Sequence, residues 1–176
     1  MFGLRQKKMS RSEQRKFLES RREDLHEIYG VQNVADMPGE KGVWEIEGNG
    51  WKLYRIGEER LLTLIRNRLV PVLYQSFNPG IDISLPSLVV DKGAVPHVSN
   101  GADVMRPGVV VLEGSFKKGS LVSVKDQTYH KILAVAEALE DSERIKAAER
   151  GKVAKNLHHV GDKVWSTVAS IAGRMA

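Results

Sequence analysis

The first patterned stretch of the chain covers residues 10–29, where apolar side chains recur at helical spacing. Ser10 followed by Glu13 has the spacing of a capping box, and Gly30 is a residue type that commonly ends a helix. The pattern therefore predicts one helix over residues 10–29. Its apolar face would be formed by Leu18, Leu25, Ile28 and Tyr29.

Short β-type runs follow between residues 43 and 65. The runs VWEIE and WKLYRI flank Gly48-Asn49-Gly50, and the turn GEER leads into LLTLI. Turns of this kind between strands indicate an antiparallel meander. Pro71 is expected to open a short helix over VLYQSF, residues 72–77. The first half is thus predicted to place one long helix against a small sheet.

From residue 85 onward, short β-branched runs alternate with glycines, in SLVV, VVVL, LVSVK and KILAVAEAL. Many short strands with glycine turns are typical of a small barrel. Short helices are expected over residues 94–100 and 142–150, and a last helix over VWSTVASIAG is expected to pack on the barrel. The predicted fold class is α+β, with an N-terminal helix-and-sheet unit followed by a β-barrel.

The net charge of +5 over 176 residues is concentrated at one end of the chain. Residues 1–22 hold eight Lys and Arg but only two acids, Glu13 and Glu19, so the rest of the chain is close to neutral. On a helix, Arg11, Arg15 and Arg22 would form a narrow stripe beside the apolar face. Such a stripe suits the phosphates of a nucleic acid, although a simple solvated face has the same composition.

Several classes of function are not supported by the sequence. The chain has no Cys, which excludes a disulfide scaffold, a Cys-ligated zinc or iron–sulfur site and a cysteine nucleophile. Its longest uncharged run, Leu69 to Ile81, is too short to span a membrane. There is no phosphate-binding glycine loop and no nucleophile elbow. The adjacent His158 and His159 would point to opposite faces of a strand, which argues against a shared metal. We expect a soluble, cytoplasmic protein that is not an enzyme and needs no cofactor or metal.

Residues 89–111, VVDKGAVPHVSNGADVMRPGVVV, combine cations with open backbone turns. Lys92-Gly93-Ala94 places an ammonium beside a turn whose free N–H groups would face a phosphate. Asn100-Gly101 is expected to end the following helix, and Arg106-Pro107-Gly108 adds a guanidinium at the next turn. These features predict a ledge for a nucleic-acid backbone. The plainer interpretation is that the glycines serve barrel corners.

The segments DKGA, SNGADVMRPG and ERGKVAKNLHHVGDKVW resemble a PUA domain. Together with the preceding residues they are similar to the malignant T-cell amplified sequence protein family and its archaeal relatives. That resemblance implies a pre-PUA domain over residues 1–84 and a PUA domain over residues 85–176. It also implies an RNA-binding surface, with the basic helix as an auxiliary. The residues carried over are Lys92, Gly93, Ala94, Asn100, Gly101, Arg106, Gly108, Lys155 and Asn156.

The resemblance implies RNA as the partner, either rRNA of the small ribosomal subunit or tRNA, and a role in translation initiation or recycling beside a translation-factor protein. Two other hypotheses stay open. The chain could be an RNA-binding accessory of an RNA-modification enzyme. It could also be a protein–protein adaptor that uses Trp44, Trp51 and Tyr54 of the first half, for which core packing is the plainer interpretation.

Overall fold

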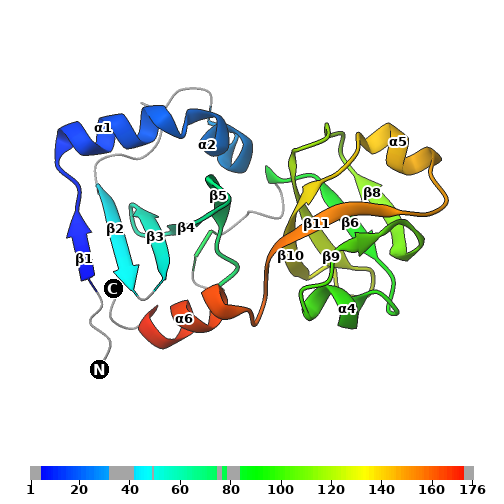
Figure 1. Ribbon diagram of the computed structural model, residues 1–176. Coiled ribbons are helices and arrows are strands. Elements are labelled where there is room, and N and C mark those ends of the chain that lie inside the picture. Colours follow the sequence, from blue (N-terminus) through cyan, green and yellow to red (C-terminus); the bar gives the residue numbers. More distant parts are fainter. Residues whose placement is uncertain (1–4, 32–41, 49, 75–76, 79–83, 173–176) are drawn as a thin grey trace.

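The computed structural model describes residues 5–31, 42–48, 50–74, 77–78 and 84–172, and it divides them between two sheets (Figure 1). The first sheet is antiparallel and has the order β1-β2-β3-β4-β5, and the second has the order β7-β11-β10-β9-β6-β8. Helices lie around both sheets, so the predicted α+β class is confirmed.

The first sheet comprises β1 (Arg5–Lys8), β2 (Val43–Gly48), β3 (Trp51–Ile56), β4 (Arg60–Ile65) and β5 (Arg68–Pro71). The second comprises β6 (Ser87–Val90), β7 (Val104–Met105), β8 (Val109–Glu113), β9 (Leu121–Asp126), β10 (Ile132–Ala138) and β11 (Lys152–His159). The helices are α1 (Arg11–Ser20), α2 (Arg22–Tyr29), α4 (Val95–Ser99), α5 (Ser142–Ala147) and α6 (Lys163–Ile171), with a 3₁₀ turn η3 (Arg106–Gly108).

The single helix predicted over residues 10–29 is in fact two helices that meet at Arg21. The capping box is present, because the Ser10 side chain accepts from the Glu13 N–H and Glu13 accepts from the Ser10 N–H. Arg21 leaves helical geometry, with φ −115° and ψ 15°, and its guanidinium donates to the backbone and side-chain oxygens of Asn67. Gly30 ends α2 in the left-handed conformation, as expected.

The predicted meander of β2, β3 and β4 is confirmed, but the sheet has an additional strand at each edge. β1 pairs with β2, and β5 pairs with β4 through the register Leu62↔Pro71. Pro71 therefore ends a strand instead of opening a helix, and residues 72–74 are not helical. The rest of that expected helix reaches residues 75–76, which lie outside the described residues.

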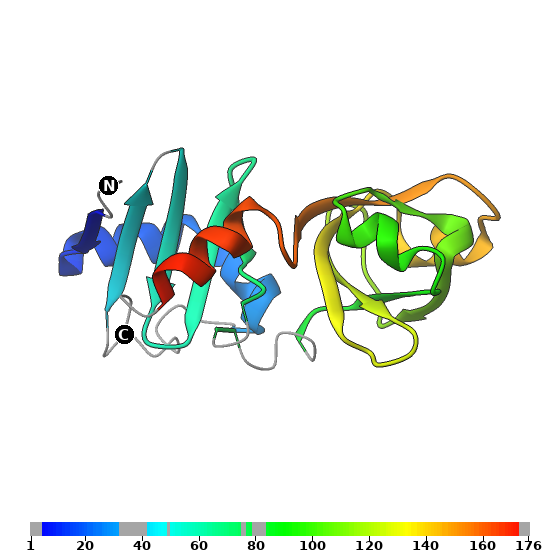
Figure 2. The same ribbon diagram turned by 90° about the horizontal axis from the view of Figure 1, so that it is seen from below.

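Both faces of the first sheet are covered by helices (Figures 1 and 2). On one face Tyr54, Ile56 and Leu62 pack with Leu25 and Ile28 of α2. The opposite face, which includes Ile46, Leu53 and Leu61, packs with Val168 and Ile171 of α6. The expectation that the last helix packs on the barrel is thus wrong. Alternate strand residues point to opposite faces, so a sheet that is apolar on both faces needs a second cover.

The second sheet curls around a core of its own, which includes Leu88, Val104, Val124, Ala136 and Ile145. The short helix predicted over residues 94–100 is present as α4, and that over 142–150 is the shorter α5. β6 and β9 run parallel, whereas the other strand pairs of this sheet are antiparallel. None of the described helices is long and apolar enough to cross a membrane.

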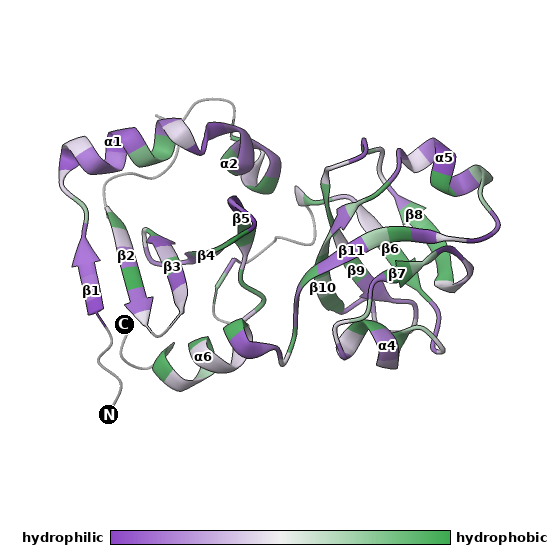
Figure 3. Ribbon diagram, in the orientation of Figure 1, coloured by the Kyte–Doolittle hydropathy of each residue, from purple (hydrophilic) through white to green (hydrophobic). Residues whose placement is uncertain are grey.

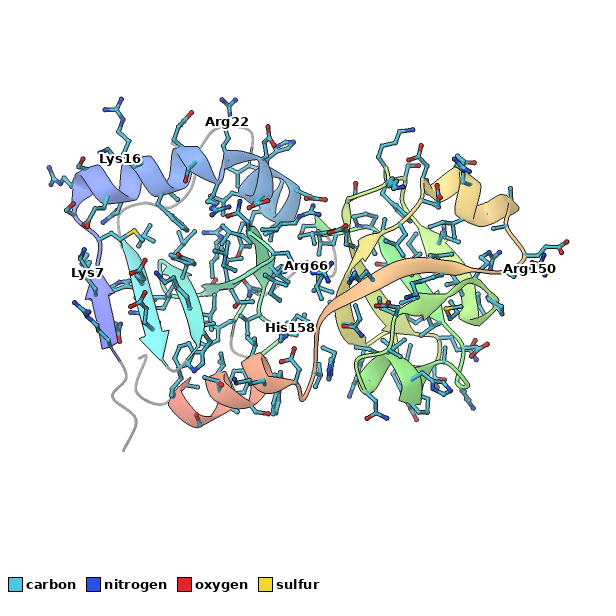
Figure 4. All side chains as sticks on the ribbon, in the orientation of Figure 1. Lys7, Lys16, Arg22, Arg66, Arg150 and His158 are labelled. Atoms are coloured by element: carbon cyan, nitrogen blue, oxygen red, sulfur yellow. The ribbon has the colours of Figure 1, made fainter. Side chains whose placement is uncertain are left out.

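The two halves are joined by shared core and by polar contacts. Leu121 and Val135 of the barrel belong to the same apolar cluster as α2 and β5. Arg68 of β5 donates to the Glu27 carboxylate and to the Gly119 carbonyl, which lies at the turn before β9. His158 at the end of β11 lies between the two halves (Figure 4).

Candidate nucleic-acid interface

A groove of about 620 Å³ lies on the barrel between the turn that follows β6 and the turn that follows β7. Three of the predicted site residues, Gly93, Ala94 and Gly108, line it. The other lining residues are Asp91, His97, Val98, Ala102, Asp103, Val104, Met105, Pro107 and Lys152. The structure thus brings together the two ends of the segment that the sequence singled out.

The two turns touch because Gly108 has no side chain. A Cβ on Gly108 would lie 2.8 Å from the Cβ of Ala94, closer than real carbon contacts allow. The backbone carbonyl of Gly108 also accepts from the Asp91 N–H at 2.9 Å. Gly108 therefore serves a close approach of the backbone that shapes the groove.

The sequence suggested that the N–H groups of the Lys92-Gly93-Ala94 turn are free. In the structure, not all of them are free. The Asp91 carboxylate accepts from the Ala94 N–H at 2.8 Å. This places a negative side chain in the groove beside Gly93. A phosphate at that spot would meet the carboxylate, so the expectation of an open anion-binding turn at Ala94 is wrong.

The cations of the groove differ in their availability. Lys92 is exposed and has no hydrogen-bond or ion-pair partner among the described residues. Lys152, by contrast, lies 2.7 Å from the Asp103 carboxylate. Burial acts to raise the pKa of the Asp103 carboxyl, but Lys152 and the Asn156 N–H outweigh it and hold that pKa below its usual value. Lys92 is therefore the available positive charge of this turn.

Arg106 is half-buried, and most of its guanidinium is used inside the fold. Its Nε donates to the Ile145 carbonyl at 2.7 Å and its Nη1 to the Val109 carbonyl at 2.8 Å. These bonds tie η3 to the C-terminal part of α5 and to β8. The remaining Nη2 has no partner in the described part of the chain. Phosphate contact by Arg106 stays a prediction, and it would rest on that one nitrogen.

The remaining predicted site residues lie around the far end of α4. Asn156 donates from its side chain to the Val98 and Ala102 carbonyls, which fastens α4 to β11. Gly101 has φ +87°, and a Cβ there would lie 3.0 Å from His159 Nε2. Asn100 is exposed, whereas Lys155 is half-buried on β11. Asn156 and Gly101 thus have clear structural tasks, and RNA contact by this group stays a prediction.

The basic helix presents its cations to solvent. Arg11, Arg15 and Arg22 are exposed and have no hydrogen-bond or ion-pair partner among the residues that the structure describes. Figure 4 shows Lys16 and Arg22 directed away from the sheet, and Figure 3 shows the largely hydrophilic surface of α1. α1 lies on the first half, away from the helix α4 of the barrel, which lines the groove (Figure 1).

Sequence reasoning did not predict the other nine lining residues of the groove, among them His97, Met105 and Lys152. Met105 is 49% exposed although it is apolar, and it stands immediately before Arg106. Lys152 follows the turn at Gly151 and pairs with Met105 of β7, and the Gly151 carbonyl accepts from the Arg106 N–H. A lysine directly after a turn glycine was the available signal, but only the strand pairing shows that it meets the β7 turn.

A possible metal site at the end of β11 is used by the fold instead. His158 is fully buried and His159 is half-buried, in agreement with their expected opposite directions. His158 Nδ1 lies 2.6 Å from Asp162 Oδ2, and its Nε2 accepts from the Leu73 N–H at 2.9 Å. Within the described residues, no group of three or more His, Asp, Glu or Cys side chains could hold a metal ion.

Comparison with known proteins identifies the barrel. A family model of the PUA domain matches residues 86–160. An uncharacterized protein of Methanocaldococcus jannaschii is 34% identical over 136 residues, which is 77% of this chain and 83% of that protein. The chain belongs to this family of PUA-domain proteins. The resemblance expected from the DKGA and SNGADVMRPG segments is therefore confirmed.

Other relatives extend the comparison to both halves. Translation machinery-associated protein 20 of Saccharomyces cerevisiae is 30% identical over 121 residues, 65% of this chain and 66% of that protein. A hypothetical protein of Pyrococcus horikoshii has a solved structure with a TM-score of 0.72 and 26% identity, covering 93% of this chain and 99% of that one. The family thus shares the arrangement of a first sheet followed by a PUA domain.

Proposed function

We propose that this chain is a non-catalytic, cytoplasmic RNA-binding protein that acts in translation initiation or recycling, on structured RNA of the small ribosomal subunit or on tRNA. RNA binding is what a PUA domain implies, and the name of the yeast relative supports the translation context. The proposal divides the chain into a pre-PUA domain, residues 1–84, and a PUA domain, residues 85–176. A translation-factor protein is the expected protein partner.

The observation that carries the proposal is the unpaired Lys92 beside the PUA groove. Lys92 is exposed, so a ribose-phosphate backbone can reach its ammonium, although the Asp91 carboxylate beside Gly93 leaves no anion site at the turn itself. The exposed Arg11, Arg15 and Arg22 supply a second, sequence-independent attraction to phosphates. Recognition of structured RNA by shape and backbone is compatible with such a surface.

A non-catalytic role is supported by the state of the most suggestive acid–base pair. His158 and Asp162 resemble a catalytic dyad by type and distance. The second ring nitrogen of His158, however, is occupied by the Leu73 N–H, and the imidazole is fully buried. A reacting group therefore has no access to it.

The geometry of the described residues favours neither of the two other hypotheses. An RNA-modification accessory would use the same PUA surface, so only its partner would differ. For the adaptor hypothesis, Tyr54 is 7% exposed and stacks on Phe17 with ring centroids 4.5 Å apart. Trp51 packs against the cluster that includes α6, and Trp44 lies beneath Lys8 and Arg55. These contacts favour the core interpretation of the three aromatics.

The test is co-sedimentation of the full chain with small subunits, large subunits and bulk tRNA over a salt series. Lys92→Ala should weaken binding and reduce the salt slope by about one counterion. Lys118→Ala is the matched control, because Lys118 is exposed, lacks a side-chain partner among the described residues and lies at the opposite end of β9.

Saturable, salt-sensitive binding to small subunits that is weaker for Lys92→Ala supports the proposal. Binding to tRNA alone supports tRNA as the RNA, and co-purification with a modification enzyme would then favour the accessory hypothesis. No binding to any RNA overturns the proposal and leaves the adaptor hypothesis. Arg106→Ala would confound this test, because it also removes two hydrogen bonds of the fold.

A further inference from the structure

The loop between β9 and β10, residues 127–131, presents a single aromatic side chain to solvent. Tyr129 is 77% exposed, which is the highest exposed fraction among the large hydrophobic residues in the described part of the chain. Its loop neighbours Gln127, Thr128, His130 and Lys131 are polar and exposed. An aromatic ring in this setting contributes nothing to the core.

The loop nevertheless has a well-defined conformation. The Asp126 carboxylate accepts from the backbone N–H groups of Thr128, Tyr129 and Lys131, at 2.9, 2.6 and 2.9 Å. The Asp126 N–H donates to the Lys131 carbonyl, and the Gln127 N–H donates to the Val90 carbonyl. The backbone around Tyr129 is therefore held in place before any partner arrives, which lowers the entropy cost of binding.

The strand pairing places this loop beside the groove. β6 and β9 are parallel neighbours with the register Val90↔Asp126, so both strands end at the same edge of the sheet. The chain after β6 is the turn that carries Lys92, and the chain after β9 is the loop that carries Tyr129. The turns of Lys92 and Tyr129, two residues that are 37 positions apart in sequence, thus lie side by side.

The charged side chains at this edge that have no partner among the described residues are cationic. Lys92 and Lys131 have no side-chain partner among the described residues. The acids nearby are all engaged: Asp91 binds the Ala94 N–H, Asp126 binds its own loop, and Glu113 binds Lys125 at 3.2 Å. Hydrogen bonds from the Tyr129 N–H and from the Lys125 ammonium are the largest causes that hold the pKa values of the Asp126 and Glu113 carboxyls, respectively, below their usual values, and His130 adds a smaller effect on both. The unpaired groups are therefore positive and aromatic.

We propose that Tyr129 is a stacking platform for an unpaired nucleobase of the bound RNA, with Lys92 and Lys131 on the flanking phosphates. This inference rests on the proposed RNA-binding function and assigns the part of the RNA that it contacts. Exposed aromatic rings next to cations hold single-stranded bases in many RNA-binding proteins. A protein hot spot would need an apolar pocket or a ring of packed neighbours, and the other residues of this loop are polar.

The experiment measures the affinity of the full chain for two fluorescent RNAs, a short single-stranded oligoadenylate and a blunt hairpin closed by a tight loop. Tyr129→Ala should weaken binding to the single strand by about five- to a hundred-fold. Tyr129→Phe should bind within about two-fold of the wild type, because stacking needs the ring and not the hydroxyl. Both variants should bind the hairpin stem like the wild type.

Two further variants complete the design. Lys131→Ala should reduce the salt slope for the single strand, whereas Lys118→Ala should not. Thermal unfolding of each variant checks the fold. Because Tyr129 is exposed, we expect no large change in the unfolding temperature of its variants.

The possible failures can be told apart. If the wild type binds neither RNA nor ribosomal subunits, the proposed function itself fails. If RNA binds but Tyr129→Ala binds the single strand as well as the wild type does, the stacking proposal is overturned and the RNA-binding function stands. Equal losses for Tyr129→Phe and Tyr129→Ala would also overturn stacking, because the hydroxyl would then be the contact. If Tyr129→Ala weakens co-sedimentation with ribosomal subunits but leaves the affinity for the single strand unchanged, the loop contacts a protein partner and the proposal is overturned.

Discussion

His158 at the end of β11 and Asp162 at the start of α6 are linked by a hydrogen bond of 2.6 Å between Nδ1 and Oδ2. Because the Leu73 N–H donates to Nε2, the proton of the neutral ring is on Nδ1 and points to the carboxylate. One buried imidazole thus connects the barrel, the first half and the last helix.

Removal of this imidazole should destabilise the whole fold. His158→Ala leaves the Leu73 N–H without its acceptor, removes one of the hydrogen bonds to the Asp162 carboxylate and opens a cavity, so we expect the free energy of unfolding to fall by about 2–4 kcal/mol. Urea unfolding followed by tryptophan fluorescence measures it. His159→Ala, one residue further on the opposite face of the strand, should cost less than half as much. Equal effects would contradict the central role of His158.

The same pair should make stability depend on pH in the acid range. Burial acts to raise the pKa of the Asp162 carboxyl. The interactions with His158 and the hydrogen bonds from the Trp165 and His159 N–H groups together outweigh this effect, so the pKa in the folded chain is below the usual value. A carboxyl with a depressed pKa contributes stability above its unfolded pKa of about 4, and this is lost as the pH falls through the folded value.

Asp162→Asn should therefore flatten the acid side of the stability curve. The urea midpoint of the wild type should fall more steeply below about pH 4 than that of the variant. Glu149→Gln is the control, since Glu149 is exposed and has no partner among the described residues. A variant curve with the wild-type slope would show that Asp162 does not titrate as inferred.

Gly108 and Ala94 should show strong energetic coupling. Gly108→Ala forces a Cβ against the Ala94 Cβ, and we expect a loss of about 1–3 kcal/mol of stability. In the double variant Gly108→Ala with Ala94→Gly the clash is gone. The loss of unfolding free energy in the double variant should therefore be smaller than the sum of the losses in the two single variants. Additive effects would mean that the two turns are not in contact.

The arginines of the basic helix should act on RNA through charge alone. Replacing Arg11, Arg15 and Arg22 by Ala should lower the salt slope of RNA binding by about two to three counterions, with the same loss for every RNA sequence. A charge-matched control replaces Lys117, Arg144 and Lys146, each of which has an acidic partner. Equal slopes for the two triple variants would show that the helix surface is only solvated.

The interior of the fold was predictable because apolar runs and turn residues define it locally. The edges were not. β1 is RQKK, which has no apolar residue, and it forms a strand only because β2 offers its backbone at the register Lys8↔Trp44. The place of α6 also depends on a distant surface. Apolar residues on both faces of LLTLI were the available signal for a second cover, but that inference was not drawn from the sequence.

For the candidate site, the sequence located the right segment but not the partners of its polar groups. Residue types alone suggested free N–H groups at Ala94 and a free guanidinium at Arg106. In the structure Asp91 takes the Ala94 N–H, and the Ile145 and Val109 carbonyls take most of Arg106. The sequence does not single out Tyr129, because only the parallel pairing of β6 and β9 brings its loop beside the turn that carries Lys92.

The position of α6 has a consequence for folding during synthesis. Ile46, Leu53 and Leu61 on the first sheet are covered by residues of α6 that are translated more than 100 positions later. The barrel, whose core is made of its own strands and short helices, can close as soon as β11 has left the ribosome. The half that is synthesised first is therefore the half that completes its packing last, with an apolar sheet face exposed in the interval.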